Sequence, residues 1–567
     1  MAAPHDSPLR DVESQSIDTH VGLDPDASEH VPSDSHDNEA PQTRAAEEQV
    51  QVTKNDIDDP FCVNFEHNDP HDPRMYPTWR KIQICLVTTA QLMWVTVISS
   101  IYSFGAHPVA EEFGISDTKA RIAAAVFLFG LGIGPVVAAP LSEDFGRVPV
   151  MVVAMALVGI TQIPCALAPN IAVLIVFRFL GGVFGAASYN AVGTVSDLWG
   201  PDEQGWGVNT FTIAAEAGTL GPVIGGYVVQ YAGWRWTFGV SGIVTAFLLV
   251  VFFLTVPETR AGVILTRRAT MLRKQHNEPR YFTLHEKQRA QHTVSALAKE
   301  MIGRPLFMLF TEPIVFWFAL FDGVNYAVIY IFLEAYPLVF EQYGFNLGQQ
   351  GLTFLGLGVG FLIAFGLYYF QMKWEAHAGT RRPDGQPTPE DRLLWGIPGG
   401  FLFPISLFFF AWTSYPPVPW IVPVIAGATF GISSHILFLL VSDYTVNAYS
   451  IYAASAIAAQ SFLREFLAGS FTLAAEPMYA RLGNQWASTL LAFIGLILSV
   501  IPVIFFKFGP IIRARSSFAQ ELQRVEQEQK EYRNKLASRA TTLNEPASAA
   551  GTANKEKLAS TDPGQQA

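Results

Sequence analysis

Runs of about 20 apolar residues recur along most of the chain, from Ile82 to Lys507. An α-helix of that length crosses the hydrocarbon core of a bilayer, and lipid forces the backbone to satisfy its own hydrogen bonds. We place twelve such spans, at 82–104, 121–141, 148–168, 171–196, 206–231, 235–256, 310–336, 348–371, 393–414, 419–442, 452–475 and 487–507. The sequence therefore predicts an all-α integral membrane protein with twelve transmembrane helices.

Charged residues are few and unevenly placed. They make up 15% of the chain, against about 25% in soluble domains. Residues 1–60 contain 15 acidic and three basic residues, and this difference of −12 equals the net charge of the whole chain. Such a composition predicts a disordered tail. The acidic balance therefore describes the tail alone, and we expect no nucleic-acid partner.

A polar segment, 257–308, separates six spans from the next six and contains ten basic residues. The positive-inside rule puts this segment and both termini in the cytoplasm. Two joined six-helix halves are typical of internally repeated transporters, with a substrate site near the midplane. The expected organisation is an acidic disordered cytoplasmic tail (1–78), an N-terminal six-helix half (79–256), a cytoplasmic linker (257–308), a pseudo-symmetric C-terminal six-helix half (309–507) and a cytoplasmic tail (508–567).

Several stretches resemble signature motifs of the major facilitator superfamily. PLSEDFGRVPV (140–150) is similar to its cytoplasmic loop motif, and RFLGGVFGAA (178–187) to its buried-arginine motif. AGTLGPVIGG (217–226) resembles the motif of proton-driven antiporters. PETRAGVIL (257–265) and YAASAIAA (452–459) resemble the fungal branch of twelve-span drug:proton antiporters. The resemblance covers about residues 57–510 and implies the major facilitator fold.

The resemblance also implies a cytoplasmic latch. Arg147 would pair with Asp197 at the inner end of span four. Glu143, beside Gly146, would lie at a helix N-terminus of the other half, where the helix dipole favours a negative charge. This latch would hold the outward-open state. The alternative is ordinary loop capping.

Span five combines small residues with a helix breaker. Gly221 and Gly225 are four residues apart, which gives a smooth face for a neighbouring helix. Pro222 frees a carbonyl that neighbours or water must satisfy. By resemblance, Gly221, Pro222, Gly225 and Gly226 would form a kink that seals the outer side of the cavity. The alternative is a packing motif without a gating role.

Glu216 precedes this motif in the same apolar run. An intramembrane carboxylate usually faces a polar cavity, and loss of water favours its neutral form. We expect it to couple proton movement to transport. The alternatives are an anchor for a cationic substrate or a structural ion pair with a partner such as Arg178. Arg178 itself stays charged, and it either biases a nearby carboxylate or hydrogen-bonds between helices.

The second half contributes a further polar set, formed by Asp322 and Glu334 in span seven, His435 in span ten, and Arg464 and Glu465 in span eleven. Asp322 and Arg464 lie at similar depth, so we expect them to pair. The candidate proton-coupling residues are Arg178, Glu216 and Asp322. The candidate cavity residues are Asn190, Glu216, Asp322, Tyr326, Tyr330, His435 and Arg464, with Phe321, Phe438 and Tyr444 as further aromatic lining. For His435 and the aromatic residues, the alternative is ordinary packing.

These features favour a proton-coupled antiporter that exports small amphipathic organic compounds, whether drugs, toxins or endogenous secondary metabolites. The alternative is a symporter or uniporter that imports a small organic solute; a transporter-like receptor is a further class. No enzyme is expected, because the spans contain no metal-binding HxxxH spacing, nucleotide loop or catalytic triad. Three cysteines without a CxxC pattern argue against a disulfide framework or zinc site. We expect a monomer that uses only the proton gradient, in the plasma membrane or alternatively the vacuolar membrane.

Overall fold

The computed structural model describes residues 59–66, 69–200, 203, 205–291, 294–379, 389–449, 452–516, 518, 520 and 524. The chain divides into two units, Met1–Lys54 and Asn55–Ala567. The two predicted tails, residues 1–78 and 508–567, lie mostly outside the described residues. The fold described below is that of the second unit.

Helices make up nearly all of this unit. The N-terminal half contains α3 (Thr78–Ser100), η2 (Ser103–Gly105), α4 (Ala106–Phe113), α5 (Asp117–Phe145), α6 (Arg147–Ala166), α7 (Ile171–Gly185), η3 (Ala186–Asn190), α8 (Ala191–Leu198), α9 (Gly205–Glu216), η4 (Ala217–Thr219), α10 (Leu220–Ala232) and α11 (Arg235–Thr255). The linker contains α12 (Ala261–His276), α13 (Leu284–Gln291) and α14 (Val294–Thr311). The C-terminal half contains α15 (Pro313–Glu341), α16 (Leu347–Leu352), α17 (Leu355–Gly379), α18 (Pro389–Thr413), α19 (Ile421–Tyr449), α20 (Ala453–Leu498) and α21 (Val500–Arg515).

In the part of the chain that the structure describes, ten helices are long and apolar enough to cross a membrane. Two features reconcile this number with the twelve predicted spans. Predicted span five is interrupted by η4, so neither α9 nor α10 reaches the length of a span. Predicted spans eleven and twelve run together as Ser455–Arg515, although the backbone turns sharply at Gly483, where φ is 73°. The fold is therefore consistent with twelve spans.

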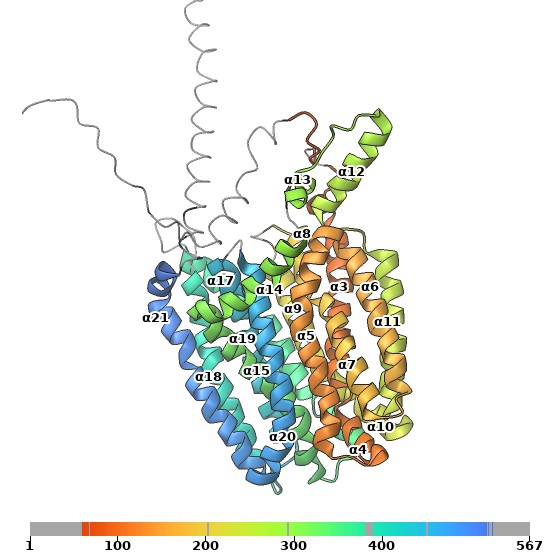
Figure 1. The fold of residues 1–567 in the computed structure, drawn as a ribbon. Coiled ribbons are helices and arrows are strands. Elements are labelled where there is room, and N and C mark those ends of the chain that lie inside the picture. The colour runs from red at the N-terminus through yellow and green to blue at the C-terminus, as the bar shows by residue number, and fades with distance from the viewer. Residues whose placement is uncertain are drawn as a thin grey trace, which may run out of the picture. The chain divides into compact units, whose positions relative to one another are not determined.

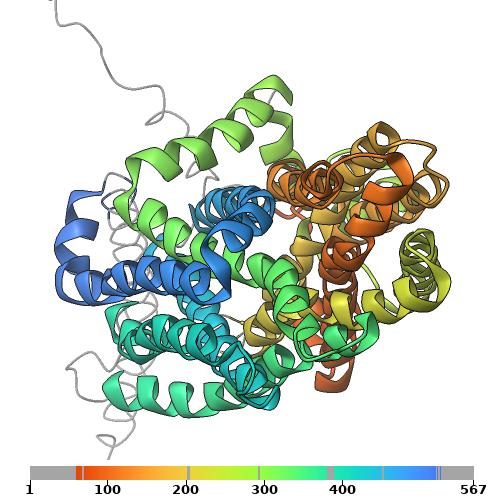
Figure 2. The same ribbon diagram turned by 90° about the horizontal axis from the view of Figure 1, so that it is seen from below.

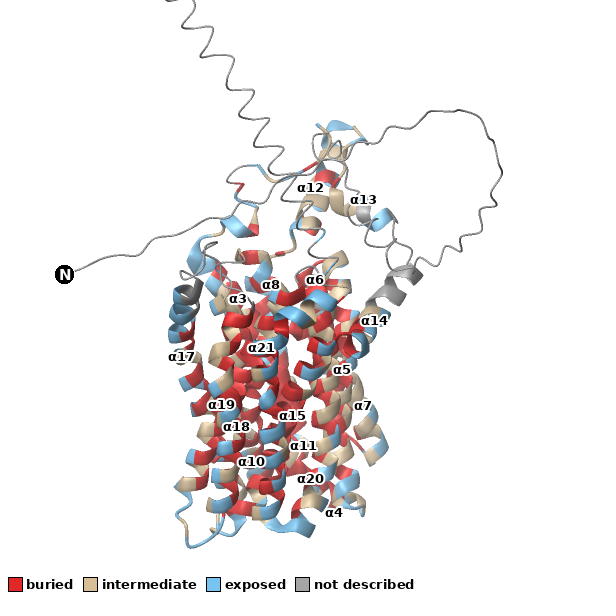
Figure 3. Ribbon diagram, turned by 90° about the vertical axis from the view of Figure 1, so that its left-hand side faces the viewer, coloured by how far each residue is buried: buried red, intermediate tan, exposed pale blue. Residues whose placement is uncertain are grey.

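The two halves form bundles that lie side by side (Figures 1 and 2). Helices α5 and α20 pack along one line of their interface, and α10 packs on α16 along another. Where α5 meets α20, the rings of Phe129 and Phe466 stack with their centroids 4.9 Å apart. Buried residues concentrate inside this body, whereas its outward faces carry exposed residues (Figure 3). On α11 the exposed ones include Phe247 and Leu254, as expected for a surface in contact with lipid.

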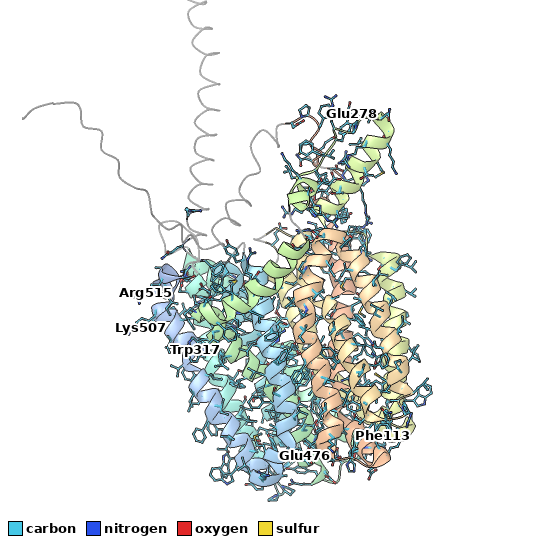
Figure 4. The ribbon with its side chains drawn as sticks, in the orientation of Figure 1. Phe113, Glu278, Trp317, Glu476, Lys507 and Arg515 are labelled. Atoms are coloured by element: carbon cyan, nitrogen blue, oxygen red, sulfur yellow. The ribbon has the colours of Figure 1, made fainter. Side chains whose placement is uncertain are left out.

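The linker and the basic C-terminal end of α21 lie at the same end of the bundles. Glu278 and Arg515 mark this end, whereas Phe113 and Glu476 mark the opposite one (Figure 4). The positive-inside rule assigns the end with the linker to the cytoplasm. We call the opposite end the outer end.

Part of the predicted N-terminal tail packs against the linker. The N–H of Val63 donates to the carbonyl of Phe282 at 2.9 Å, and the N–H of Phe282 donates to Phe61 at 3.0 Å. Arg268 of α12 forms an ion pair with the buried carboxylate of Asp69. Residues shortly before α3 therefore pack against the linker, at the end of the bundles that the positive-inside rule assigns to the cytoplasm.

Candidate functional site

The break in predicted span five places Glu216 in the protein interior. Pro222 has no N–H, so the carbonyl of Gly218 loses its usual helical partner. The hydroxyl of Ser100 donates to that carbonyl at 2.5 Å. This confirms the expectation that a neighbour satisfies the freed group. Glu216 ends α9 directly before η4, and it is 1% exposed.

The glycines of the same motif face two different neighbours. A Cβ on Gly225 would meet the carbonyl of Ile101, the residue directly after α3, so the predicted helix contact is present. A Cβ on Gly226 would lie 2.5 Å from the carbonyl of Leu347, in the α16 helix of the other half. The motif therefore packs one helix within its half and another across the interface, toward the outer end.

Glu216 bonds across the interface to α19. Its Oε2 lies 2.7 Å from Nδ1 of His435, and its Oε1 accepts from the hydroxyl of Ser434 at 3.1 Å. Nε2 of His435 lies 2.9 Å from Oδ1 of Asn209, in α9. The side chains of Glu216 and His435 are 0% and 1% exposed. Arg178, the partner named for the alternative of a structural ion pair, is therefore not bonded to Glu216. Asn209 and Ser434 belong to this network, and the sequence did not reveal them.

Asn209 indicates where the protons of this pair lie. Its Nδ2 donates to the carbonyl of Phe365 at 3.3 Å, which leaves Oδ1 facing His435. An amide oxygen only accepts, so Nε2 of His435 carries a hydrogen. The 2.7 Å between Nδ1 and Oε2 of Glu216 is a hydrogen-bond distance, so a hydrogen between these two atoms would complete the network.

A second buried cluster lies in the C-terminal half. Arg464 contacts Oδ2 of Asp322 at 3.3 Å, which confirms the expected pairing, and Oε1 of Glu465 at 3.4 Å. Tyr189 of η3 donates to the same Glu465 oxygen at 3.1 Å. The guanidinium also lies over the ring of Phe438, at 4.7 Å. Tyr189 therefore joins this cluster to the N-terminal half.

Arg178 makes helix-to-helix bonds instead of an ion pair. It donates to backbone carbonyls of α3 and α5, those of Ile98 (2.8 Å), Ser99 (2.9 Å) and Ala123 (3.0 Å). Among the described residues it makes no bond to a carboxylate, so its contacts are those of the alternative, hydrogen bonding between helices, and its role in proton coupling stays a prediction. The hydroxyl of Ser99 bonds to Tyr330 at 2.7 Å, which links this carbonyl cluster to the other half.

The other predicted cavity residues divide into two groups. Tyr330 bonds to Ser99 of the other half at 2.7 Å and so belongs to the interface. Tyr326 lies beside it, with hydroxyl oxygens 3.4 Å apart, and Arg464 lies 5.1 Å over the Tyr326 ring. The remaining three lie elsewhere: Asn190 donates to Ala138, Phe321 packs on Phe403, and Tyr444 bonds to Glu390. Each of these three contacts is helix packing within one half.

The cytoplasmic latch contains the expected pair and two further residues. Nε of Arg147 lies 3.1 Å from Asp197. Glu258 accepts from the backbone N–H groups of Arg147 (2.9 Å) and Val148 (3.3 Å), which caps the N-terminus of α6. Arg260 contacts Asp197 at 3.5 Å. Glu258 and Arg260 belong to the sequence PETR (257–260), which directly follows the predicted span 235–256. This position at the end of a span was the feature of the sequence that could have placed both residues in the latch.

Two details refine the predicted latch. Gly146 has φ of 105°, and a Cβ there would meet the carboxylate of Glu258, so the turn requires glycine. Glu143 lies 4.0 Å from Arg147 and 3.7 Å from Arg260. Its ion-pair contacts in this conformation are therefore with one arginine of its own half and one of the linker, and the expected contact of Glu143 with the other half stays a prediction.

An ion cluster joins the halves at the outer end. Nε of Arg121 in α5 lies 2.6 Å from Glu334 in α15, and Nη1 bonds to Glu476 in α20. Glu476 is labelled at that end in Figure 4. The sequence placed Glu334 in span seven but gave no partner for it. Together with the contact of Gly226 on α16, this cluster joins the two halves at the outer end, and we expect it to keep that side closed in this conformation.

We expect the Arg147–Asp197 pair to control the rate of conformational change. Arg147→Gln and Asp197→Asn should each slow transport about tenfold while substrate affinity changes little, and a double-mutant cycle should give a coupling of about 1 kcal/mol. The exposed pair Arg235–Glu112, 2.6 Å apart in the N-terminal half, is the matched control. Strictly additive effects at Arg147 and Asp197 would contradict a shared interaction.

Comparison with known proteins agrees with this arrangement. The profile of the Major Facilitator Superfamily matches residues 86–473. The uncharacterized transporter mfs2 of Schizosaccharomyces pombe is 38% identical over 492 residues, which cover 85% of this chain and 86% of mfs2. The efflux pump FUBT of Fusarium oxysporum is 34% identical over 470 residues, which cover 82% of this chain and 79% of FUBT.

The fold is also that of a solved transporter. The proton:xylose symporter XylE matches with a TM-score of 0.55 and 17% sequence identity, over 76% of this chain and 96% of XylE. At this identity the likeness concerns the fold alone. The profile match and the relatives above 30% identity show that this chain belongs to the major facilitator superfamily, as a multi-pass membrane transporter and not an enzyme.

Proposed function

We propose that this transporter is a proton-coupled antiporter that exports small amphipathic organic compounds. The observation that carries the proposal is the buried pair of Glu216 and His435, which joins the two halves at 2.7 Å. With a hydrogen between Nδ1 and Oε2, this buried pair would be a group that can give up and take back a proton. A group of this kind is what coupling to a proton gradient requires.

The charge of the pair connects protonation to conformation. With its proton, the pair is neutral and all its hydrogen bonds are made, so burial between the halves is tolerated. Without the proton, it becomes a carboxylate beside a neutral imidazole. Burying such an uncompensated charge costs several kcal/mol, so the closed interface then becomes unfavourable. Loss of the proton therefore favours separation of α9 from α19.

The direction of transport rests on the sequence and on relatives. The Gly221–Gly226 segment resembles the antiporter motif, and FUBT, at 34% identity, is named an efflux pump. We place the protein in the plasma membrane, where export of drugs would give multidrug resistance, with the vacuolar membrane as the alternative. We further propose that it acts as a monomer. Its two six-helix halves would span residues 79–256 and 309–507.

Two successive experiments test the substrate and the transport mode. Cells that lack the protein should retain compounds that complemented cells export, and mass spectrometry identifies them. The purified protein is then reconstituted in vesicles that contain a pH-sensitive dye, and a retained compound is added outside. Antiport predicts that the lumen becomes more alkaline as the compound enters. Acidification would indicate symport and no change would indicate uniport, and both would contradict the proposal.

A further inference from the structure

The cluster around Arg464 has more hydrogen-bond acceptors than the protein satisfies. Among the described residues, Oδ1 of Asp322, Oε2 of Glu465 and Oδ1 of Asn325 are buried and have no hydrogen-bond partner. The three residues are 2%, 0% and 1% exposed. Buried polar atoms nearly always have partners, because an unsatisfied one destabilises the fold. Three together indicate that the site is built to receive hydrogen-bond donors.

The three acceptors belong to one small region. Asp322 and Asn325 are three residues apart on α15, which puts them on the same face of the helix. Asp322 and Glu465 both contact the guanidinium of Arg464, at 3.3 and 3.4 Å. Arg464 offers only one unpartnered donor, its Nε. The surplus of unpaired groups is therefore on the acceptor side.

The charge of the cluster also favours a ligand that donates hydrogen bonds and carries a positive charge. Two carboxylates share one guanidinium, so the ionised cluster has a net charge of −1. Around it lie aromatic rings: Arg464 is 4.7 Å from the ring centre of Phe438, 5.1 Å from that of Tyr326 and 5.8 Å from that of Tyr189. Aromatic faces attract cations and also bind apolar groups.

We propose that Asp322, Asn325 and Glu465 form the binding site for a protonated primary amine, the ammonium group of an amphipathic substrate. An ammonium group has three N–H donors and one positive charge. It would satisfy the three acceptor oxygens and cancel the net negative charge at once. The apolar body of the amine would pack on Tyr326 and Phe438. This inference rests on the proposed function and names the substrate class of that transporter.

The same geometry connects the amine site to the proton-carrying pair. Nδ2 of Asn325 donates to the hydroxyl of Ser434 at 3.0 Å, and that hydroxyl donates to Glu216 at 3.1 Å. A cation held by Asn325 is thus one hydroxyl away from the carboxylate of Glu216. Its positive charge disfavours a second positive charge nearby. Amine and proton therefore compete, which is the relation that antiport needs.

Binding of two probes to the purified full-length protein tests the amine site without any gradient. Tryptamine has an ammonium group, whereas N-acetyltryptamine keeps the same indole and replaces the ammonium by a neutral amide. Calorimetry at pH 7 should give tryptamine an affinity at least about tenfold higher. Equal affinities, or no binding of either probe, would overturn the proposal, and this comparison needs no variant.

Variants then locate the site. Asp322→Asn and Glu465→Gln should each weaken tryptamine binding about tenfold and leave N-acetyltryptamine unchanged. Glu312→Gln is the matched control, since this buried carboxylate is bonded to Tyr449 at 2.9 Å, directly before the same helix α15. An equal loss of tryptamine binding in the control would also overturn the proposal. If the amine-binding tests fail, antiport of another substrate class is not contradicted. If the vesicle assay shows no proton exchange, binding of amines at this site is not contradicted.

Discussion

Glu216→Gln is expected to abolish accumulation driven by a proton gradient while downhill exchange of substrate continues. A gradient of one pH unit can sustain roughly a tenfold substrate ratio in one-to-one exchange, because a factor of ten in concentration corresponds to about 1.4 kcal/mol. In the variant this ratio should fall to about one. The measurement is substrate uptake into vesicles with an imposed pH gradient, with and without an uncoupler.

The contacts of Glu216 explain why glutamine should fold and yet fail to couple. The glutamine amide can donate to Nδ1 of His435, and its oxygen can accept from Ser434, where Glu216 now bonds at 2.7 and 3.1 Å. His435 can keep its bond to Asn209 in the neutral form. All partners stay satisfied, but residue 216 no longer takes up or releases a proton. The variant therefore imitates the protonated pair permanently.

The alternative roles of Glu216 give different outcomes. A cation anchor would show weaker binding of cationic substrates and unchanged binding of neutral ones. A purely structural partner would show low folded yield, with the surviving protein still coupled. Glu112→Gln, at an exposed ion pair, controls for the loss of a carboxylate as such. Normal gradient-driven accumulation by well-folded Glu216→Gln protein would contradict the coupling role.

Gly226→Ala should force the outer side open, whereas Gly225→Ala should damage the N-terminal half itself. An alanine Cβ at position 226 would lie 2.5 Å from the carbonyl of Leu347, in the opposite half, and separation of the halves relieves this contact. At position 225 the Cβ would meet Ile101 of the same half, where no rigid-body motion helps. Overpacking of this kind typically costs about 1–3 kcal/mol. Neighbouring glycines should thus give different defects.

A cysteine at Ser99 reports on the opening. Ser99 bonds to Tyr330 across the interface and is 2% exposed, so a thiol there should be shielded while the outer side is closed. With Cys62, Cys85 and Cys165 replaced, labelling by an impermeant reagent from outside should be at least about tenfold faster in Gly226→Ala, since a shift of about 1.4 kcal/mol changes a population tenfold. Gly225→Ala should instead lower the folded yield.

Gly358→Ala is the control for both glycine variants. It lies in α17, and a Cβ there would have no neighbour within 4 Å. Its labelling rate and yield should therefore match those of the parent protein. Unchanged labelling in Gly226→Ala would contradict the closing role of the contact between α10 and α16.

Several features followed from the sequence because they depend on local properties of the chain. Apolar run length determines which segments form spanning helices, and the basic linker predicts their orientation through the positive-inside rule. The position of Asp322 and Arg464 along their spans was enough to predict that they pair, since residues at one depth can meet. The proline in AGTLGPVIGG required a donor for the Gly218 carbonyl, and Ser100 supplies it.

The partners of the buried charges were decided by tertiary structure alone. Glu216 and His435 are 219 positions apart, and nothing local to either residue encodes the other. Their contact depends on the rotation of α9 and α19 about their axes and on how the two halves meet. The same rotation turns Arg178 toward backbone carbonyls of α3 and α5, away from every carboxylate among the described residues. Apolar patterning determines the depth of a side chain in the membrane, but only the packed bundle determines which side chain it faces.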